Sequence, residues 1–154
     1  MGKESAGLLL YRIRDGTLKV LLVHPGGPFW QKKDAGAWTI PKGELASGET
    51  PQETAKREFE EELGFKPMGK LWKLQSVRQK AGKLVHAWAM EGDCDPTAAQ
   101  SNTFTIEWPL NSGHMREFPE VDRAAFFSIP EAMTKINPAQ ISLLKELSQK
   151  LGFR

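Results

Sequence analysis

The chain has very little cysteine and tyrosine, and it has no long apolar segment. Among its 154 residues, Cys94 is the only cysteine and Tyr11 the only tyrosine. One cysteine excludes a framework of internal disulfides and is typical of a reducing compartment, so we expect a cytoplasmic protein. The apolar run Leu8–Leu10 is too short for a signal peptide or a membrane span, and we expect no contact with a membrane.

Neither sign of charge dominates the composition. The chain has 21 Lys and Arg against 19 Asp and Glu, which gives a formal net charge of +2. Acidic residues gather between Glu53 and Glu62, so the basic residues are dispersed over the rest of the chain. This distribution lacks the basic stripe of a polynucleotide-binding protein, and we do not expect nucleic acid as a partner. The length and the lack of repeats or linkers predict one domain over residues 1–154.

The segment from Gly43 to Phe65 carries the residues with the clearest chemistry. Glu58, Glu61 and Glu62 are spaced so that in a helix they share one face. Three like charges on adjacent turns repel one another unless a cation occupies that face. Because Mg²⁺ is held by one or two carboxylates together with substrate phosphates, the spacing predicts a metal site. The alternative is a solvated acidic face with no ligand.

Both ends of this helix are marked in the sequence. Thr50 and Glu53 have the spacing of a capping box, with Pro51 at the first helical position. Gly64 predicts a left-handed end to the helix. Upstream, Gly43 brings a backbone carbonyl close to a ligand with no side chain in the way. The face opposite the glutamates carries an apolar stripe for core packing: Ala55, Phe59 and Leu63.

The same segment resembles the Nudix box, a pattern of many fixed positions at set spacing. The residues on its fixed positions are Gly43, Glu49, Arg57, Glu58, Glu61, Glu62 and Gly64, with Phe59 and Phe65 on the apolar ones. Phe59 is large for its position, which concerns packing more than chemistry. The resemblance implies an α/β fold, a three-layer α/β/α sandwich with a mixed central sheet. The flanking segments AGLLLYR, FWQKKDAGAW and EFPEVDRAAFF are similar to those of bacterial proteins expected to be NTP pyrophosphohydrolases.

The resemblance also implies an activity. Nudix enzymes hydrolyse a pyrophosphate bond in a nucleoside diphosphate linked to a group X, and here we expect a nucleoside triphosphate or a dinucleoside polyphosphate. The residues that hold Mg²⁺, or Mn²⁺ in its place, are expected to be Gly43 through its carbonyl, Glu58, Glu61 and Glu62. Arg57 is expected to pair with Glu49 and to orient the glutamates. The small nucleotide would be the partner, and the protein a monomer or a homodimer.

The general base of this family is either a glutamate of the box or an acid from a later loop. Glu120 and Glu117 are the candidates from the later loop, and we place Glu120 with Arg57, Glu58 and Glu61 in the catalytic set. Two other functions stay open: an RNA 5′-pyrophosphohydrolase, and a silent Nudix-fold module that binds nucleotides for regulation. Such modules usually lose box glutamates, whereas this chain keeps them all.

Two segments offer candidate substrate contacts. The loop Phe29–Gly36 places two aromatic residues beside two lysines, so Trp30 and Lys33 could stack a base and contact a phosphate. Equally, these rings could pack on the sheet as ordinary surface structure. Lys42, directly before the box, is a further candidate for a phosphate contact, with a solvated lysine as the alternative.

The remaining pattern predicts the flanking elements. Alternation, turn residues and helical spacing indicate the following: a hairpin of 6–14 and 18–24, a short strand 38–40, a hairpin of 71–78 and 83–91 turning at 80–82, a strand 104–108, a helical turn 130–135, and a helix from Asn137. In that last helix the apolar positions are Ile141, Leu144, Leu147 and Leu151. Residues 109–121 are expected to be a long irregular loop.

Overall fold

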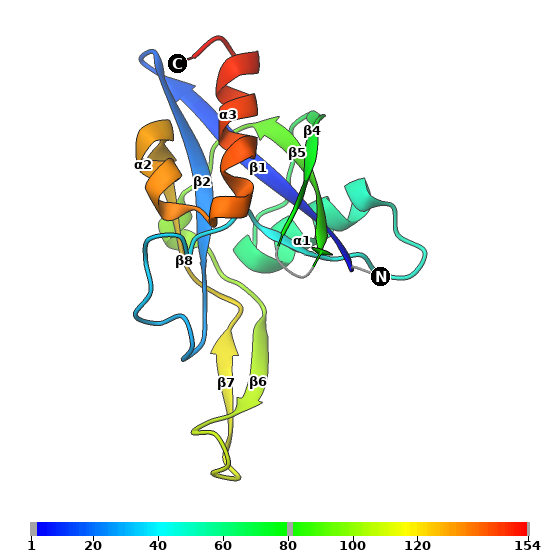
Figure 1. Cartoon of the computed structure of the whole chain (residues 1–154), viewed down its shortest axis with the longest axis vertical. Coiled ribbons are helices and arrows are strands. Elements are labelled where there is room, and N and C mark those ends of the chain that lie inside the picture. The colour runs from blue at the N-terminus through cyan, green and yellow to red at the C-terminus, as the bar shows by residue number, and fades with distance from the viewer. Residues whose placement is uncertain (1–2, 80–81, 154) are drawn as a thin grey trace.

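The computed structural model describes residues 3–79 and 82–153 and has a six-stranded sheet at its centre (Figure 1). Its strands are β1 (Glu4–Arg14), β2 (Thr17–Pro25), β3 (Lys42–Glu44), β4 (Leu71–Arg78), β5 (Leu84–Glu91) and β8 (Val121–Ser128). The order is β4-β5-β1-β2-β8, and β3 also pairs with β1. Because β1 runs parallel to β5 and antiparallel to β2, the sheet is mixed.

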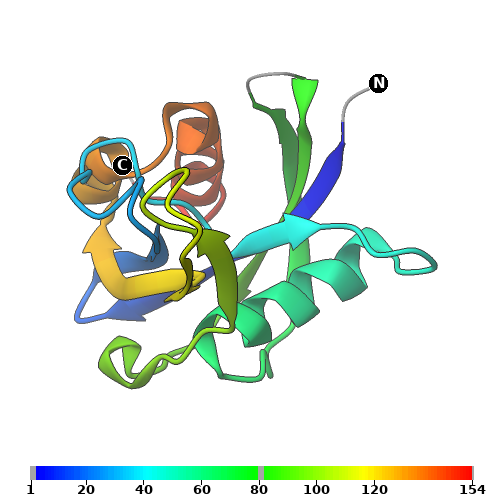
Figure 2. The same cartoon turned by 90° about the horizontal axis from the view of Figure 1, so that it is seen from below.

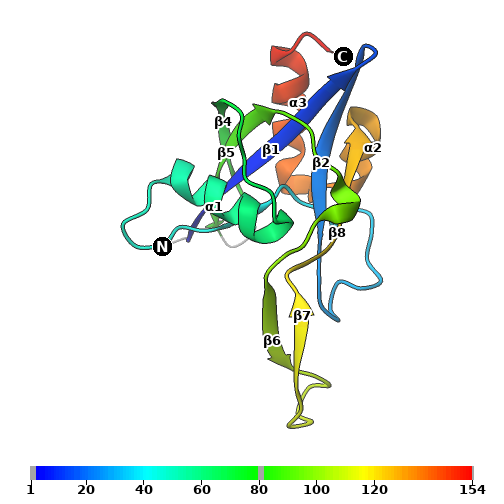
Figure 3. The ribbon, with the colours of Figure 1, turned by 180° about the vertical axis from the view of Figure 1, so that it is seen from behind.

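Helices cover both faces of this sheet (Figures 1 and 3). Leu8 and Leu10 of β1 pack in one buried cluster with the apolar face of α1 (Pro51–Leu63). Their neighbour Leu9 points to the other face, where α2 (Ile129–Lys135) and α3 (Ile141–Lys150) cover a second cluster. The alternation along β1 therefore divides the core in two, and the predicted three-layer sandwich with a mixed sheet is confirmed.

The predicted ends of α1 are confirmed in detail. The backbone N–H of Glu53 donates to Thr50 Oγ1 at 3.2 Å, and the Thr50 N–H donates to Glu53 Oε1 at 2.9 Å. Gly64 ends the helix with φ 78° and donates its N–H to the carbonyl of Glu60. The predicted apolar stripe, Ala55, Phe59 and Leu63, is buried. The helix thus begins and ends where its local sequence predicts, which fixes the rotation of its acidic face.

The short strand predicted at residues 38–40 is wrong. Thr39 forms only an isolated bridge with Val23, and the strand lies slightly later, in β3. The reason is a close approach that the local pattern does not encode. A Cβ on Gly7 would lie 2.7 Å from Lys42 Cβ, so glycine in β1 is what allows β3 to pair there. The predicted turn at 80–82 includes residues 80 and 81, which lie outside the described residues.

The prediction of an irregular loop over 109–121 is also wrong. β6 (Thr103–Glu107), expected as a strand, pairs with β7 (Met115–Pro119) in a separate two-stranded sheet. Asn111 and Gly113 adopt positive φ angles of 62° and 77° in the turn between them. This hairpin extends away from the six-stranded sheet (Figures 1 and 3). It joins β8 directly, and a 3₁₀ helix, η2 (Pro96–Ala98), precedes it.

The C-terminal elements follow the prediction closely. The Asn137 side chain accepts a hydrogen bond from the N–H of Ala139 and begins a 3₁₀ helix, η3 (Pro138–Gln140), which leads into α3. Leu144 and Leu147 are fully buried against the sheet. No helix in the described part of the chain is long and apolar enough to cross a membrane.

Candidate active site

A cavity of about 380 Å³ lies beside the acidic face of α1. Its lining residues are Val23, Pro25, Thr39, Lys42, Gly43, Glu44, Glu58, Glu62, Glu120 and Val121. They come from β2, β3, α1, the start of β8 and the residues just before β3 and β8, so segments far apart in the sequence meet at this point. The structure therefore brings Gly43, Glu58, Glu62, Lys42 and Glu120 together.

Arg57 organises the carboxylates around this cavity. Its Nε and Nη2 donate to the two oxygens of Glu49 at 2.7 and 3.0 Å, a two-point ion pair. Its Nη1 donates to Glu58 at 2.8 Å and to Glu61 at 3.0 Å. The predicted pairing of Arg57 with Glu49 is present, and one guanidinium fixes the orientation of three carboxylates.

Thr54 completes this network, and sequence reasoning missed it. Its buried hydroxyl donates to Glu49 Oε1 at 2.6 Å. Hydrogen bonds from Arg57, and then from Thr54, lower the pKa of Glu49 to about 2. Glu49 therefore stays ionised and holds Arg57 in place. Thr54 carried no signal in the sequence because a threonine one turn inside a helix is an ordinary residue.

Gly43 lies against the carboxylate of Glu58. A Cβ at position 43 would lie 2.1 Å from Glu58 Cδ and 2.3 Å from its Oε1. A side chain there would displace the carboxylate, so glycine at position 43 lets Glu58 hold this place. The backbone of β3 and the acidic face of α1 consequently form one wall of the cavity.

The negative charge of the carboxyl groups in the cavity is poorly balanced by positive charge. Burial, followed by the charges of Glu58 and Glu120, raises the pKa of Glu62 to about 9. Burial and the charge of Glu61 also raise the pKa values of Glu58 and Glu120 above their ordinary value. Together these acids disfavour one another's ionised forms, and added positive charge would relieve the repulsion.

These residues fit a divalent metal ion, although they are not arranged as a closed site. Within residues 3–79 and 82–153, no group of three or more His, Cys, Asp and Glu side chains is positioned as metal ligands. Arg57 instead occupies oxygens of Glu58 and Glu61. The donor set of carboxylate and carbonyl oxygens nevertheless has the chemistry that Mg²⁺ prefers. The raised pKa values indicate the same, because an ion would neutralise the acids.

Lys42 is the cationic group of the cavity lining. Burial lowers its pKa, and the neighbouring charge of Lys83 acts in the same direction, while Glu62 and Glu58 oppose the shift. Among the described residues, Lys42 has no carboxylate partner within 4 Å. Its ammonium group is therefore available to an anion that enters the cavity.

The other predicted contacts lie outside this lining. Trp30 and Lys33 belong to the loop between β2 and β3, where Lys33 Nζ lies 5.1 Å from the centroid of the Trp30 ring. Glu61 is held by Arg57 and does not belong to the lining. Of the two candidate bases, Glu120 lines the cavity, whereas Glu117 lies exposed on β7 opposite Thr105.

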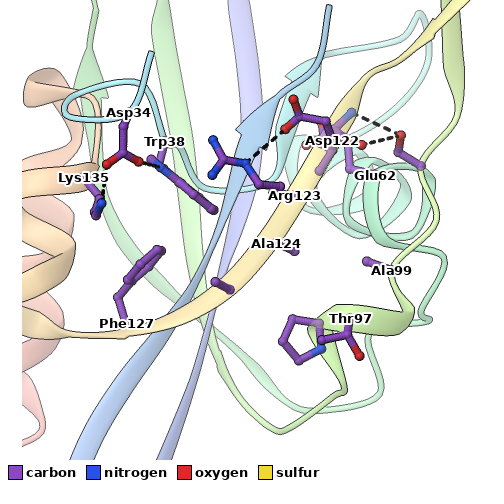
Figure 4. Close-up of a pocket in the computed structure, with 14 residues that line it drawn as sticks. Asp34, Trp38, Glu62, Thr97, Ala99, Asp122, Arg123, Ala124, Phe127 and Lys135 are labelled. Carbon is purple, nitrogen blue, oxygen red and sulfur yellow. Dashed lines mark hydrogen bonds and ion pairs between the residues drawn. The ribbon is translucent and has the colours of Figure 1, made fainter. Parts of the chain in front are cut away.

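A larger cavity of about 570 Å³ lies next to the first one and shares Glu62 and Val121 with it (Figure 4). Its charged groups are largely paired with each other. Asp34 accepts hydrogen bonds from Lys135 and from Trp38 Nε1, and Arg123 faces Asp122 at 3.9 Å. The smaller cavity, with its unpaired lysine and crowded carboxylates, is therefore the better candidate for chemistry on an anion.

A buried histidine, which sequence reasoning missed, connects the loop to β8. His24 is fully buried, and its Nδ1 lies 2.7 Å from Asp122 Oδ1. Its Nε2 lies 2.6 Å from the carbonyl of Lys33. The two ring nitrogens therefore link a carboxylate of β8 to a backbone carbonyl of the loop. This contact fixes the loop that carries Trp30 against the strand that follows Glu120.

Comparison with known families decides the identity of the fold. The family model of the NUDIX domain matches residues 3–147, which is nearly the whole chain. The chain belongs to the NUDIX family. The glutamates around Arg57 are thus the glutamates of a Nudix box.

Two curated relatives align with parts of this NUDIX chain. A Mycobacterium tuberculosis protein assigned as an 8-oxo-dGTP diphosphatase is 48% identical over 62 residues, 40% of this chain and 27% of the relative. An RNA pyrophosphohydrolase of Francisella tularensis is 41% identical over 49 residues, 31% of this chain and 32% of the relative. The aligned part thus spans only about a third or less of each relative.

Solved structures match the NUDIX fold over almost its full length. A Caenorhabditis elegans Ap4A hydrolase complex has a TM-score of 0.69 at 23% identity and covers 97% of this chain and 98% of its own. The NUDIX domain of Shewanella oneidensis NrtR, solved with ADP ribose, has a TM-score of 0.69 at 18% identity, over 98% of this chain and 89% of its own. At these identities the likeness concerns the fold.

Proposed function

We propose that this NUDIX protein, acting as one domain over residues 1–154 in the cytoplasm, hydrolyses a pyrophosphate bond in a nucleoside diphosphate linked to a group X. The observation that carries the proposal is the cavity in which Glu58, Glu62 and Glu120 crowd together beside Lys42. In a complex of a nucleotide polyphosphate with a divalent cation, the cation would neutralise these carboxylates and the phosphates would pair with Lys42. The small nucleotide is the partner, and the protein is a monomer or a homodimer.

Each residue has a defined role in this proposal. Glu58, Glu61, Glu62 and the Gly43 carbonyl hold Mg²⁺, with Mn²⁺ as a substitute, and Arg57 orients the glutamates. When bound, the ion neutralises the charge that develops on the phosphate oxygens. Lys42 contacts a phosphate of the substrate other than the one that the water attacks. Glu120, which faces the same cavity, accepts the proton of the attacking water as general base.

The substrate is a nucleoside triphosphate or a dinucleoside polyphosphate. The 8-oxo-dGTP diphosphatase and the Ap4A hydrolase among the similar proteins support these two classes. The Francisella tularensis relative supports a second candidate, the 5′ end of triphosphorylated RNA. A silent regulatory module is the weakest alternative, because every box glutamate is present and the acids face an accessible cavity.

The proposal predicts phosphate or nucleotide release that requires Mg²⁺ and an intact acidic face. The substrate panel holds nucleoside triphosphates, 8-oxo-dGTP, diadenosine tetraphosphate, ADP-ribose, NADH and triphosphorylated RNA. We expect turnover of at least one of them, and a loss of about 10²-fold or more in kcat for Glu61→Gln, because removing one charge weakens the metal face.

The matched control is Glu60→Gln. Glu60 lies on the same helix but is exposed, and among the described residues it takes part in no ion pair. The control should keep wild-type kcat. Metal-dependent turnover of no substrate on the panel would reject the enzyme and leave the binding module, and equal losses in both variants would reject the role given to Glu61.

A further inference from the structure

A group of exposed and half-buried aromatic side chains stands at one end of the molecule. It consists of Phe29 and Trp30 from the loop after β2, and Phe104, Trp108 and Phe118 from the β6–β7 hairpin, and we name it the aromatic platform. Phe29 is 54% exposed and Trp30 40% exposed. Seen from below, the loop and the hairpin lie side by side (Figure 2). The three rings of the hairpin are half-buried beside them, and two adjacent exposed aromatic residues are unusual for a surface with no binding role.

The platform is held in shape by its own contacts. The rings of Phe29 and Trp108 meet edge to face, with centroids 5.3 Å apart. The rings of Phe104 and Phe118 lie 6.1 Å apart on paired positions of the hairpin. A Cβ on Gly27 would lie 2.8 Å from the Phe104 ring, so the loop packs directly on the hairpin. The exposed faces of Phe29 and Trp30 are therefore presented by a supported surface.

Basic groups lie over these rings. Lys33 Nζ is 5.1 Å from the centroid of Trp30, and the Arg116 guanidinium is 5.5 Å from that of Phe118. Aromatic faces beside amines and guanidinium groups provide stacking for bases and charge for phosphates. A two-fold interface between copies would bring like charges together, which is unfavourable, so this combination favours a nucleotide as the occupant.

The platform is continuous with the candidate active site. The N–H of Gly26 donates to the carbonyl of Glu120 at 2.9 Å, which joins the loop to the end of the hairpin. Pro25, which precedes Gly26, and Glu120 itself both line the cavity of the candidate active site. At the rise of a strand, Phe118 lies about 7 Å and Arg116 about 13 Å along β7 from Glu120. A few phosphates or one nucleotide would span this distance.

We propose that the aromatic platform binds a second nucleobase of the substrate, one joined through phosphates to the pyrophosphate that is cleaved. The inference rests on the proposed function, since the cavity must hold that pyrophosphate. The group X is then a nucleoside, and it comes either from a dinucleoside polyphosphate or from the second nucleotide of an RNA 5′ end. In a substrate with one base, that base lies on the other side of the cleaved pyrophosphate, and the platform stays unused.

The test compares ligands with one and two bases on the platform variant Phe29→Ala/Trp30→Ala. We expect KM for diadenosine tetraphosphate, or for a triphosphorylated dinucleotide RNA, to rise about 5- to 150-fold, the loss of one or two base stacks. The KM for ATP should rise far less than the KM for the two-base substrate. The two-base substrate whose KM rises in the variant identifies the source of the second base. The control is Met68→Ala, at an apolar residue outside the platform that is 84% exposed, and it should change the KM of neither substrate.

Equilibrium binding separates the two proposals. Titration calorimetry with a methylene-bridged dinucleoside tetraphosphate, which is not cleaved, measures the platform without turnover. Weaker binding to the variant supports the platform even if the wild type hydrolyses nothing, a result that would reject only the proposed function. Equal affinities, no binding to wild type, or an equal loss for ATP would overturn the platform. A dimer that dissociates in the variant with unchanged ligand affinity would overturn it too, and make the surface an interface between copies.

Discussion

The ion pair of Arg57 and Glu49 shows how single residues control the site. Glu49 does not line the cavity, yet it binds two nitrogens of the guanidinium that orients Glu58 and Glu61. Sequence reasoning predicted this pair from the fixed positions of the Nudix box. It could not predict that Glu62 lines the cavity while Glu61 does not, because that division depends on how β3 and the start of β8 meet the helix.

Glu49→Gln should destabilise the fold in a pH-dependent way. The folded pKa of Glu49 is about 2, below the ordinary 4.5, so its ionised form stabilises the native state above pH 4.5. That stability is lost as pH falls from about 4.5 toward 2. The urea midpoint of the variant should therefore lie below that of the wild type at pH 7, and the gap should narrow between pH 4.5 and pH 3. A gap that does not depend on pH would contradict this origin.

At the scale of elements, α1 and β3 mark the limits of sequence reasoning. The helix was predicted to its terminal residues because Thr50, Glu53 and Gly64 act within a few residues of the chain. β3 was missed because its pairing depends on Gly7, more than thirty residues away. β7 was missed for a related reason. Its five residues are mostly exposed and carry no apolar alternation, and only Asn111 and Gly113 indicated a turn.

The cap of α1 should contribute measurably to stability. Thr50→Ala removes the side-chain oxygen that accepts from the N–H of Glu53, and leaves that donor without its partner. We expect a loss of about 1 kcal/mol in the free energy of unfolding, measured by urea denaturation. Thr50→Ser keeps the hydroxyl and should restore most of the stability. If the serine variant were as unstable as the alanine variant, the methyl group rather than the cap would be responsible.

At the scale of the whole molecule, the core and the hairpin are separate structures. The two buried clusters cover the two faces of the six-stranded sheet, and within the described residues β6 and β7 pair only with each other. The three-layer core followed from strand alternation, helical spacing and the family pattern. The position of the projecting hairpin could not be predicted, because nothing in the sequence of a short, exposed pair of strands requires it to extend away from the core.

This separation predicts that the hairpin can be shortened without loss of the fold. Thr105 and Glu117 are direct partners across β6 and β7, so replacing residues 106–116 by Asn-Gly should close the strands with a two-residue turn. The core loses no buried cluster, and we expect Tm by calorimetry within about 4 °C of the wild type. Phe29 loses its contact with Trp108 and Phe118 loses Arg116. Binding of a dinucleoside tetraphosphate should therefore weaken while turnover of ATP continues. A large fall in Tm would mean that the hairpin belongs to the cooperative folding unit after all.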